Sequence, residues 1–138
     1  MIKKIKVQVA LAKSKLGTSW AVIRDPANGK YLLCRRAEGT NNAGQWGFPG
    51  GGVDEGESQL AALVREMFEE IVVRVDESML HAVAQTGTVM WFEMFLRVKP
   101  KKTEEVDAFQ WVNAYDLDQY ELHKSVKDYF KALRNQAR

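Results

Sequence analysis

Residues 51–73 read GGVDEGESQLAALVREMFEEIVV, a glycine-rich turn followed by a stretch with the periodicity of a helix. At about 100° per residue, a helix over residues 57–72 places three carboxylates on one side, those of Glu66, Glu69 and Glu70. The opposite side is apolar, and we expect it to pack against a sheet. The residues on this apolar side are Leu60, Leu63, Val64, Met67, Phe68 and Ile71.

The acidic strip has two interpretations. It can be the solvated face of a surface helix, because glutamate is a good helix former. However, Glu66 and Glu70 are like charges at i,i+4, an arrangement that costs roughly 0.2–0.5 kcal/mol and needs a counter-charge. A hard divalent cation would supply that charge, and carboxylate oxygens suit Mg²⁺.

The segment before the helix is rich in glycine. Residues 38–56, which we interpret as one long loop, hold seven of the ten glycines in the chain. Glycine permits unusual backbone angles and close approach to a ligand, and a long loop inside a compact domain is usually functional. Main-chain carbonyls of the consecutive glycines 50–52 could therefore complete the oxygen shell of a cation.

The flanking segments predict strands and a second helix. An amphipathic pattern indicates a helix over residues 121–134, and the DPANG sequence at 25–29 indicates a hairpin turn. Strands interleaved with two helices indicate an α/β or α+β sandwich. The predicted strands cover residues 4–12, 18–24, 30–36, 79–84, 88–98 and 109–112.

The composition is that of an ordinary globular protein. A length of 138 residues with 46% hydrophobic residues suits one domain over 1–138, and a net charge of +2 gives no reason to expect a nucleic-acid partner. No apolar run reaches the roughly eighteen residues of a membrane span, and without a clear signal segment we expect the cytoplasm. Cys34, the only cysteine, excludes an intramolecular disulfide and is expected to be an inert buried thiol.

The order of residues around the helix resembles the signature box of the Nudix hydrolases. That box is Gly, five residues, Glu, seven residues, then Arg-Glu-hydrophobic-any-Glu-Glu-any-Gly-hydrophobic. Gly51, Glu57 and the run Arg65–Val73 agree with it at eight of nine specified positions. Residues 46–51 and 109–112 also look similar to the segments that flank the box and the late strand in that family.

One position departs from the box, because Val72 stands where the family has glycine. That glycine ends the helix in a left-handed conformation, in which valine is strained, so we expect this helix to exit differently. The resemblance implies an α/β/α sandwich with a mixed sheet. It also implies hydrolysis of a nucleoside diphosphate linked to another moiety, with Mg²⁺, or Mn²⁺ as an alternative, as cofactor.

The resemblance further implies roles for the residues of the box. Arg65 would orient a glutamate through charge-assisted hydrogen bonds. The general base would be Glu66 or a glutamate of a later loop, here Glu105 or its neighbour Glu104, although a plain solvated loop is the alternative for these two. The implied metal ligands are the carbonyl of Gly51 and the carboxylates of Glu57, Glu66, Glu69 and Glu70.

The substrate is less closely defined by the sequence. Arg35 and Arg36 could reach a substrate phosphate, although alternation on a strand would turn one of them outward. The backbones of Gly50 and Gly52 are the other predicted substrate contacts. Markers of the ADP-ribose, NADH and coenzyme A hydrolases are absent. The compact length and the entry at residues 46–51 resemble the small nucleoside triphosphate members of the family, and this resemblance favours release of pyrophosphate from a (deoxy)nucleoside triphosphate.

Other substrates and one other class of function stay open. Within the same chemistry, the alternatives are a dinucleoside polyphosphate, a nucleotide sugar or an RNA 5′ end. In another class, the chain would be a catalytically idle nucleotide-binding module. Members of the family are often dimers, so a homodimer is compatible with the resemblance.

Overall fold

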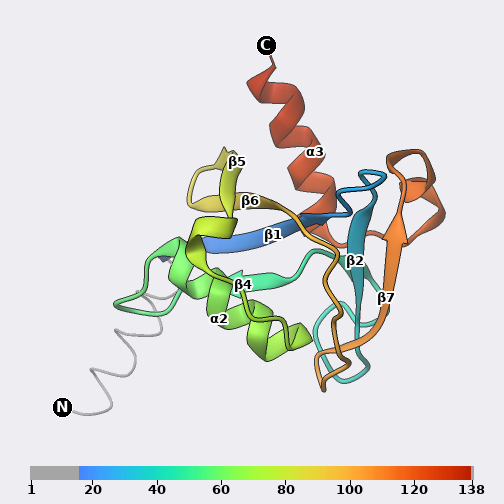
Figure 1. Ribbon diagram of the computed structural model, residues 1–138, viewed down its shortest axis with the longest axis horizontal. Coiled ribbons are helices and arrows are strands. Elements are labelled where there is room, and N and C mark those ends of the chain that lie inside the picture. Colours follow the sequence, from blue (N-terminus) through green and yellow to red (C-terminus); the bar gives the residue numbers. More distant parts are fainter. Residues whose placement is uncertain (1–15, 138) are drawn as a thin grey trace.

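The computed structural model describes residues 16–137 as a mixed β-sheet with helices (Figure 1), which confirms the predicted α/β fold. The predicted strand over residues 4–12 lies outside the described residues. The strands are β1 Thr18–Arg24, β2 Tyr31–Arg36, β3 Trp46–Gly47, β4 Gly50–Gly52, β5 His81–Thr86, β6 Val89–Phe95 and β7 Val106–Val112. The helices are α2 Gln59–Ile71 and α3 Lys124–Gln136, with 3₁₀ turns η1 Glu77–Met79 and η2 Ala114–Gln119. Among the described helices, none is long and apolar enough to cross a bilayer.

Alternation along β1 builds the two faces of the sheet. Trp20 and Val22 belong to the hydrophobic core that includes α3, whereas Ala21 and Ile23 belong to the core that includes α2. In Figure 1, α2 and α3 accordingly lie on opposite sides of β1, as expected for an α/β/α sandwich. The sheet is mixed because β1 pairs with β6 in parallel, while β5 with β6 and β2 with β7 are antiparallel.

The sheet splits between β1 and β2. The predicted hairpin forms around residues 25–29, yet β1 and β2 pair only at Arg24 and Tyr31. Beyond that pair, β4 adds to β1 and β3 adds to β2. The prediction of one irregular loop over residues 38–56 is therefore wrong in its second half, because the diverging strands leave backbone groups that these short strands satisfy.

The other predicted elements are present with shifted ends. The strands predicted over 79–84 and 88–98 form the β5–β6 hairpin. The short strand predicted over 109–112 is the second half of β7, and the helix predicted over 121–134 is α3, which begins at Lys124. Shifts of a few residues at the ends of elements are common and do not change the architecture.

Both ends of α2 are capped. The hydroxyl of Ser58 accepts a backbone N–H of the first turn at 3.0 Å. The helix ends at Val72, which is left-handed with φ 58° and ψ 41°. Its N–H donates to the carbonyl of Phe68 four residues back (3.0 Å), which is the αL capping motif, and the N–H of Val73 donates to the carbonyl of Met67 (3.3 Å). The expectation that this helix exits differently is wrong, since valine adopts the conformation that glycine would take.

Replacing Val72 with glycine is expected to stabilise the protein. A left-handed residue other than glycine costs about 1–2 kcal/mol, and the entropy that glycine adds to the unfolded chain returns about 0.4–1 kcal/mol of this. We therefore expect the melting temperature of V72G to rise by roughly 2–5 °C in a thermal scan. V72A keeps the strained Cβ and serves as the control. A melting temperature of V72G below that of the wild type would mean that packing of the valine outweighs the strain.

Two positions of α2 differ from the helical wheel. Phe68, predicted in the apolar face, is 38% exposed, and the guanidinium of Arg74 lies 4.1 Å from the centre of its ring. Glu70, predicted on the side opposite the core, is buried at 6% exposure. Leu63 and Met67 are fully buried as predicted. The apolar face is therefore rotated so that one carboxylate of the strip is drawn into the interior.

Candidate active site

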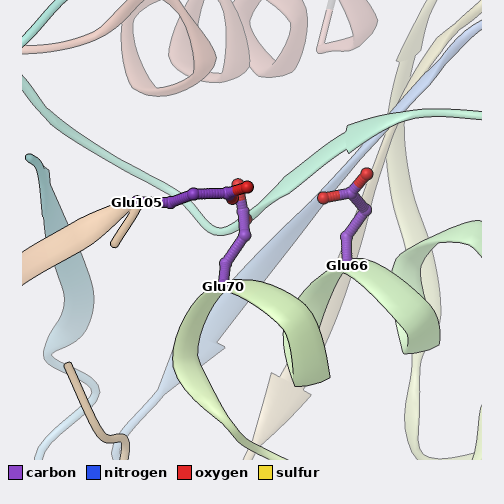
Figure 2. A group of neighbouring side chains, drawn as sticks. All are labelled: Glu66, Glu70 and Glu105. Atoms are coloured by element: carbon purple, nitrogen blue, oxygen red, sulfur yellow. The ribbon is translucent and has the colours of Figure 1, made fainter. Parts of the chain in front are cut away.

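Three carboxylates from two distant segments meet beside the split in the sheet. Glu66 and Glu70 lie one turn apart on α2, and Glu105 lies just before β7. Each offers an oxygen, and these oxygens all lie within 4.8 Å of one another. Figure 2 shows the side chains of Glu66 and Glu70 rising from the helix, with that of Glu105 reaching toward Glu70 from the side. We call these three residues the acid cluster.

Burial changes the protonation of the cluster. Desolvation, together with the charges of Glu66 and Glu105, raises the pKa of Glu70 to about 8, against the lowering effect of a hydrogen bond from the Gly50 N–H at 2.7 Å. Burial also raises the pKa of Glu66, and the nearby Arg65 guanidinium partly opposes this. Without a cation, the protein therefore holds a proton on the cluster near neutral pH.

The glycines of β4 make this close packing possible. A Cβ on Gly51 would lie 2.9 Å from the carboxyl group of Glu66. A Cβ on Gly50 would lie 2.1 Å from the carbonyl oxygen of Ser19, and its φ of +146° is itself unfavourable for other residues. Only glycine at these two positions lets the strand lie against both β1 and the carboxylates of α2.

The cluster fits a hard divalent cation. Its donor set consists of carboxylate oxygens, which suit Mg²⁺ and Mn²⁺. Burial, with the neighbouring carboxylates, raises the pKa of Glu70 and so disfavours its ionised form. A cation would provide the compensating positive charge, with Glu66, Glu70 and Glu105 as the residues placed to hold it.

Arg65 connects the glycine-rich turn to the helix. Its guanidinium forms a bidentate pair with Glu57, with Nε–Oε2 and Nη2–Oε1 distances of 2.8 and 3.0 Å. It also donates to the carbonyl of Gly52 at 3.1 Å and to Glu66 at 3.1 Å. The paired guanidinium holds the pKa of Glu57 below its usual range. Arg65 therefore links Glu66 to β4, which is the arrangement that its predicted orienting role requires.

Replacing Arg65 with lysine is expected to lower kcat by roughly tenfold or more, because a point charge cannot reproduce the bidentate fork. Lysine would keep the positive charge but could not bind Glu57 and reach the Gly52 carbonyl together. Steady-state kinetics and a thermal scan of the same sample would separate turnover from folding. R74K, in which the exposed guanidinium over Phe68 is exchanged, is the matched control. A kcat of R65K within twofold of the wild type would show that other contacts hold Glu66.

Two predicted metal ligands lie outside the cluster. Glu57 pairs with Arg65 and accepts the N–H of Asp54 at 2.9 Å. Glu69 contacts Arg65 at 3.2 Å, with about half of its side chain exposed. Asp54, 3.4 Å from Arg65, was not singled out from the sequence. The sequence signal that could have indicated Asp54 is its position in the glycine-rich turn, three residues before Glu57.

A cavity of about 440 Å³ opens at the start of the 38–45 loop. Arg35 and Arg36 both line it, so the prediction that one would turn outward is wrong. The pairing register of β2 with β7 shifts between these two residues, which breaks strict alternation. Arg35 pairs with Asp107 at 2.7 Å, and its guanidinium lies 5.7 Å from the ring centre of Trp46. The charge of Arg36 also lowers the pKa of Glu70, so this cavity-lining arginine acts electrostatically on the acid cluster.

Two further side chains have structural roles. His123, assigned no role from the sequence, is buried and accepts the Ser125 N–H at 3.1 Å as the cap of α3. Burial and the charge of Arg36 lower its pKa to about 4, so it is neutral. Cys34 is a buried free thiol, as predicted, and burial raises its pKa.

Comparison with known proteins is consistent with this site. A family model described as NUDIX domain matches residues 15–135. The chain is 32% identical over 120 residues to the nucleoside triphosphatase NudI of Escherichia fergusonii. This alignment covers 72% of this chain and 84% of that protein. It is 50% identical over 44 residues to the CTP pyrophosphohydrolase of Escherichia coli, an alignment that spans 32% of this chain and 33% of that relative. The crystal structure of a MutT protein from Methanosarcina mazei superposes with a TM-score of 0.65 and 25% identity, over 89% of this chain and 95% of that chain.

Proposed function

We propose, from the premise that this chain belongs to the NUDIX domain family and is a hydrolase, that it cleaves the diphosphate linkage of a (deoxy)nucleoside triphosphate. The products would be a nucleoside monophosphate and pyrophosphate. The observation that carries the proposal is the convergence of Glu66, Glu70 and Glu105 against the glycine backbone of β4. A diphosphate repels an attacking nucleophile, and a divalent cation held by such a cluster would neutralise the phosphate charge that causes this repulsion.

In this proposal, Glu66, Glu70 and Glu105 hold Mg²⁺ or Mn²⁺, with the Gly51 carbonyl as a further ligand. A bound cation would supply charge neutralisation at the phosphates and Lewis-acid stabilisation of the leaving oxygen. Glu57 and Glu69 would support the cation site indirectly, through their ion pairs with Arg65. Arg65 itself would keep Glu66 in place.

Removal of a proton from the attacking water is assigned to Glu105. It is the most exposed of the three carboxylates, so it can reach a water beside the substrate. Glu66 is the alternative base, but its carboxyl is held 3.1 Å from Arg65 and faces the Gly51 backbone.

The cavity lined by Arg35, Arg36 and Trp46 would receive the rest of the substrate. Arg36, which lines this cavity, is suited to a phosphate as a planar donor. The backbones of Gly50 and Gly52 stay predicted substrate contacts. Gly50 already gives its N–H to Glu70, so the amide of Gly52 is the better placed of the two.

The names of some relatives support a triphosphate substrate, whereas others are named RNA pyrophosphohydrolase. One is called a nucleoside triphosphatase and another a CTP pyrophosphohydrolase. A dinucleoside polyphosphate, a nucleotide sugar or an RNA 5′ end remains the alternative within the same chemistry. A catalytically idle module is disfavoured, because all the carboxylates of the box are present.

A substrate panel tests the proposal. Purified protein with Mg²⁺ would be given nucleoside triphosphates (including oxidised and methylated bases), dinucleoside polyphosphates, ADP-ribose and nucleotide sugars. Pyrophosphate and phosphate would be read separately. Pyrophosphate with a monophosphate from one triphosphate is the expected result. Activity on the other compounds alone would refute the triphosphate and keep the mechanism, and no activity on any compound would refute both.

A further inference from the structure

The connection between β6 and β7 crosses the C-terminal end of α2. The carbonyls of the last turn of a helix have no partner within the helix. Here the N–H of Lys101 donates to the carbonyl of Ile71 at 2.9 Å. The hydroxyl of Thr103 donates to the carbonyl of Glu70 at 2.6 Å. This connection is therefore bound to α2 at Glu70, one of the residues of the acid cluster.

The same hydroxyl also binds the backbone of a second cluster residue. Oγ1 of Thr103 accepts the N–H of Glu105 at 3.2 Å, which a hydroxyl can do while donating its own proton. The N–H of Thr103 donates to the carbonyl of Val106 at 3.0 Å, and the carbonyl of Glu105 accepts the N–H of Ala37 at 2.9 Å. One side-chain oxygen thus joins the backbones of Glu70 and Glu105.

We propose that Thr103 is a positioning residue, whose hydroxyl sets the distance between the carboxylate of Glu105 and those of Glu66 and Glu70. Glu105 is exposed and belongs to no helix or strand, and its backbone is held by two hydrogen bonds, one from the Ala37 N–H to its carbonyl and one from its N–H to the Thr103 hydroxyl. The fixed partner is α2, where Glu66 and Glu70 are held by the Arg65 and Gly50 contacts. A misplacement of about 1 Å in a catalytic group can cost on the order of a hundredfold in rate. The inference rests on the proposed function of the cluster.

Substitution of the hydroxyl tests this role. T103V keeps the shape of the side chain and removes both hydrogen bonds, whereas T103S keeps both. We expect T103V to weaken binding of Mn²⁺ to the metal-free protein by roughly tenfold or more, measured by calorimetry, and to lower kcat by a similar factor. T103S should restore both quantities, and KM should change by less than about threefold in either variant. T88V, which removes an exposed threonine hydroxyl on the β5–β6 turn, is the matched control.

A double-mutant cycle separates positioning from general stability. If Thr103 acts through Glu105, T103V should change neither Mn²⁺ affinity nor kcat in an E105Q background. If it only stabilises the end of α2, the effects of T103V and E105Q should multiply, and the proposal is overturned. Wild-type Mn²⁺ affinity and kcat in T103V would also overturn it.

Amide hydrogen exchange distinguishes failure of the positioning role of Thr103 from failure of the proposed function. T103V should increase exchange at the amide of Glu105, whose bonding partner is lost, whether or not a substrate is known. A wild-type protein with no turnover on the panel would refute the proposed function alone. Unchanged exchange at residue 105 together with unchanged Mn²⁺ affinity would refute the role of Thr103 alone.

Discussion

Replacement of Glu70 with glutamine is expected to reduce kcat by about two orders of magnitude or more, with the fold intact. Glutamine has nearly the same shape and can still accept the Gly50 N–H that Glu70 accepts at 2.7 Å. It removes the charge that the cluster needs to hold a divalent cation and keeps the packing around it. The same loss is expected for E66Q, because its carboxyl lies within 4.8 Å of the same site.

The measurement is steady-state turnover with Mg²⁺ on the substrate that the panel identifies, together with a thermal scan of each variant. E77Q, which neutralises an exposed carboxylate in η1, is the control and should turn over as the wild type does. Turnover near the wild-type rate in both E66Q and E70Q would refute the assignment of the metal site. A loss confined to samples that no longer melt cooperatively would instead point to folding.

Part of this site could be predicted from the sequence. Helical periodicity is local, so residues 59–71 were recognisable as a helix and Glu66 and Glu70 as neighbours on it. That Glu105 completes the cluster depends on the path of the β6–β7 connection, which no spacing within the chain specifies. The pairing of Arg65 with Glu57 likewise became visible only once the glycine-rich turn was placed beside the helix, whereas its pairing with Glu69 is an i,i+4 contact within the helix.

The fold shows the same division between local and long-range effects. Patterns of apolar residues located most strands of the sheet. The strands β3 and β4 have two and three residues, too few for a pattern, and exist because β1 and β2 diverge. At Val72, the propensity of valine argued against a left-handed end, and the hydrogen bonds that cap α2 prevailed over it. Tertiary contacts overrode local preference at this position.

The metal-free protein is expected to lose stability as the pH rises from 6.5 to 8. The folded-state pKa of Glu70 is raised to about 8, whereas an unfolded glutamate titrates near 4.3, so the folded state holds an extra proton between these values. Stability falls with pH wherever the folded state binds more protons. His123 works in the opposite direction, since its folded pKa is lowered to about 4, but only about 0.4 kcal/mol of its contribution is still to be gained above its unfolded pKa of 6.5. The window from pH 6.5 to 8 therefore reports mainly on the buried carboxyl groups of the cluster, Glu70 first.

Urea unfolding at several pH values in EDTA measures this effect. Because one pKa unit corresponds to 1.36 kcal/mol, the free energy of unfolding should fall by about 1–2 kcal/mol between pH 6.5 and 8. In E70Q the side chain is neutral throughout, so the profile should be nearly flat and the variant more stable than the wild type at pH 8. Added Mg²⁺ should raise the stability of the wild type at pH 8 and leave that of E70Q nearly unchanged, because a ligand stabilises only the state that binds it. A flat profile for the wild type would mean that Glu70 is ionised in the folded protein without a cation, and that burial of this carboxylate has no energetic cost for a metal to relieve.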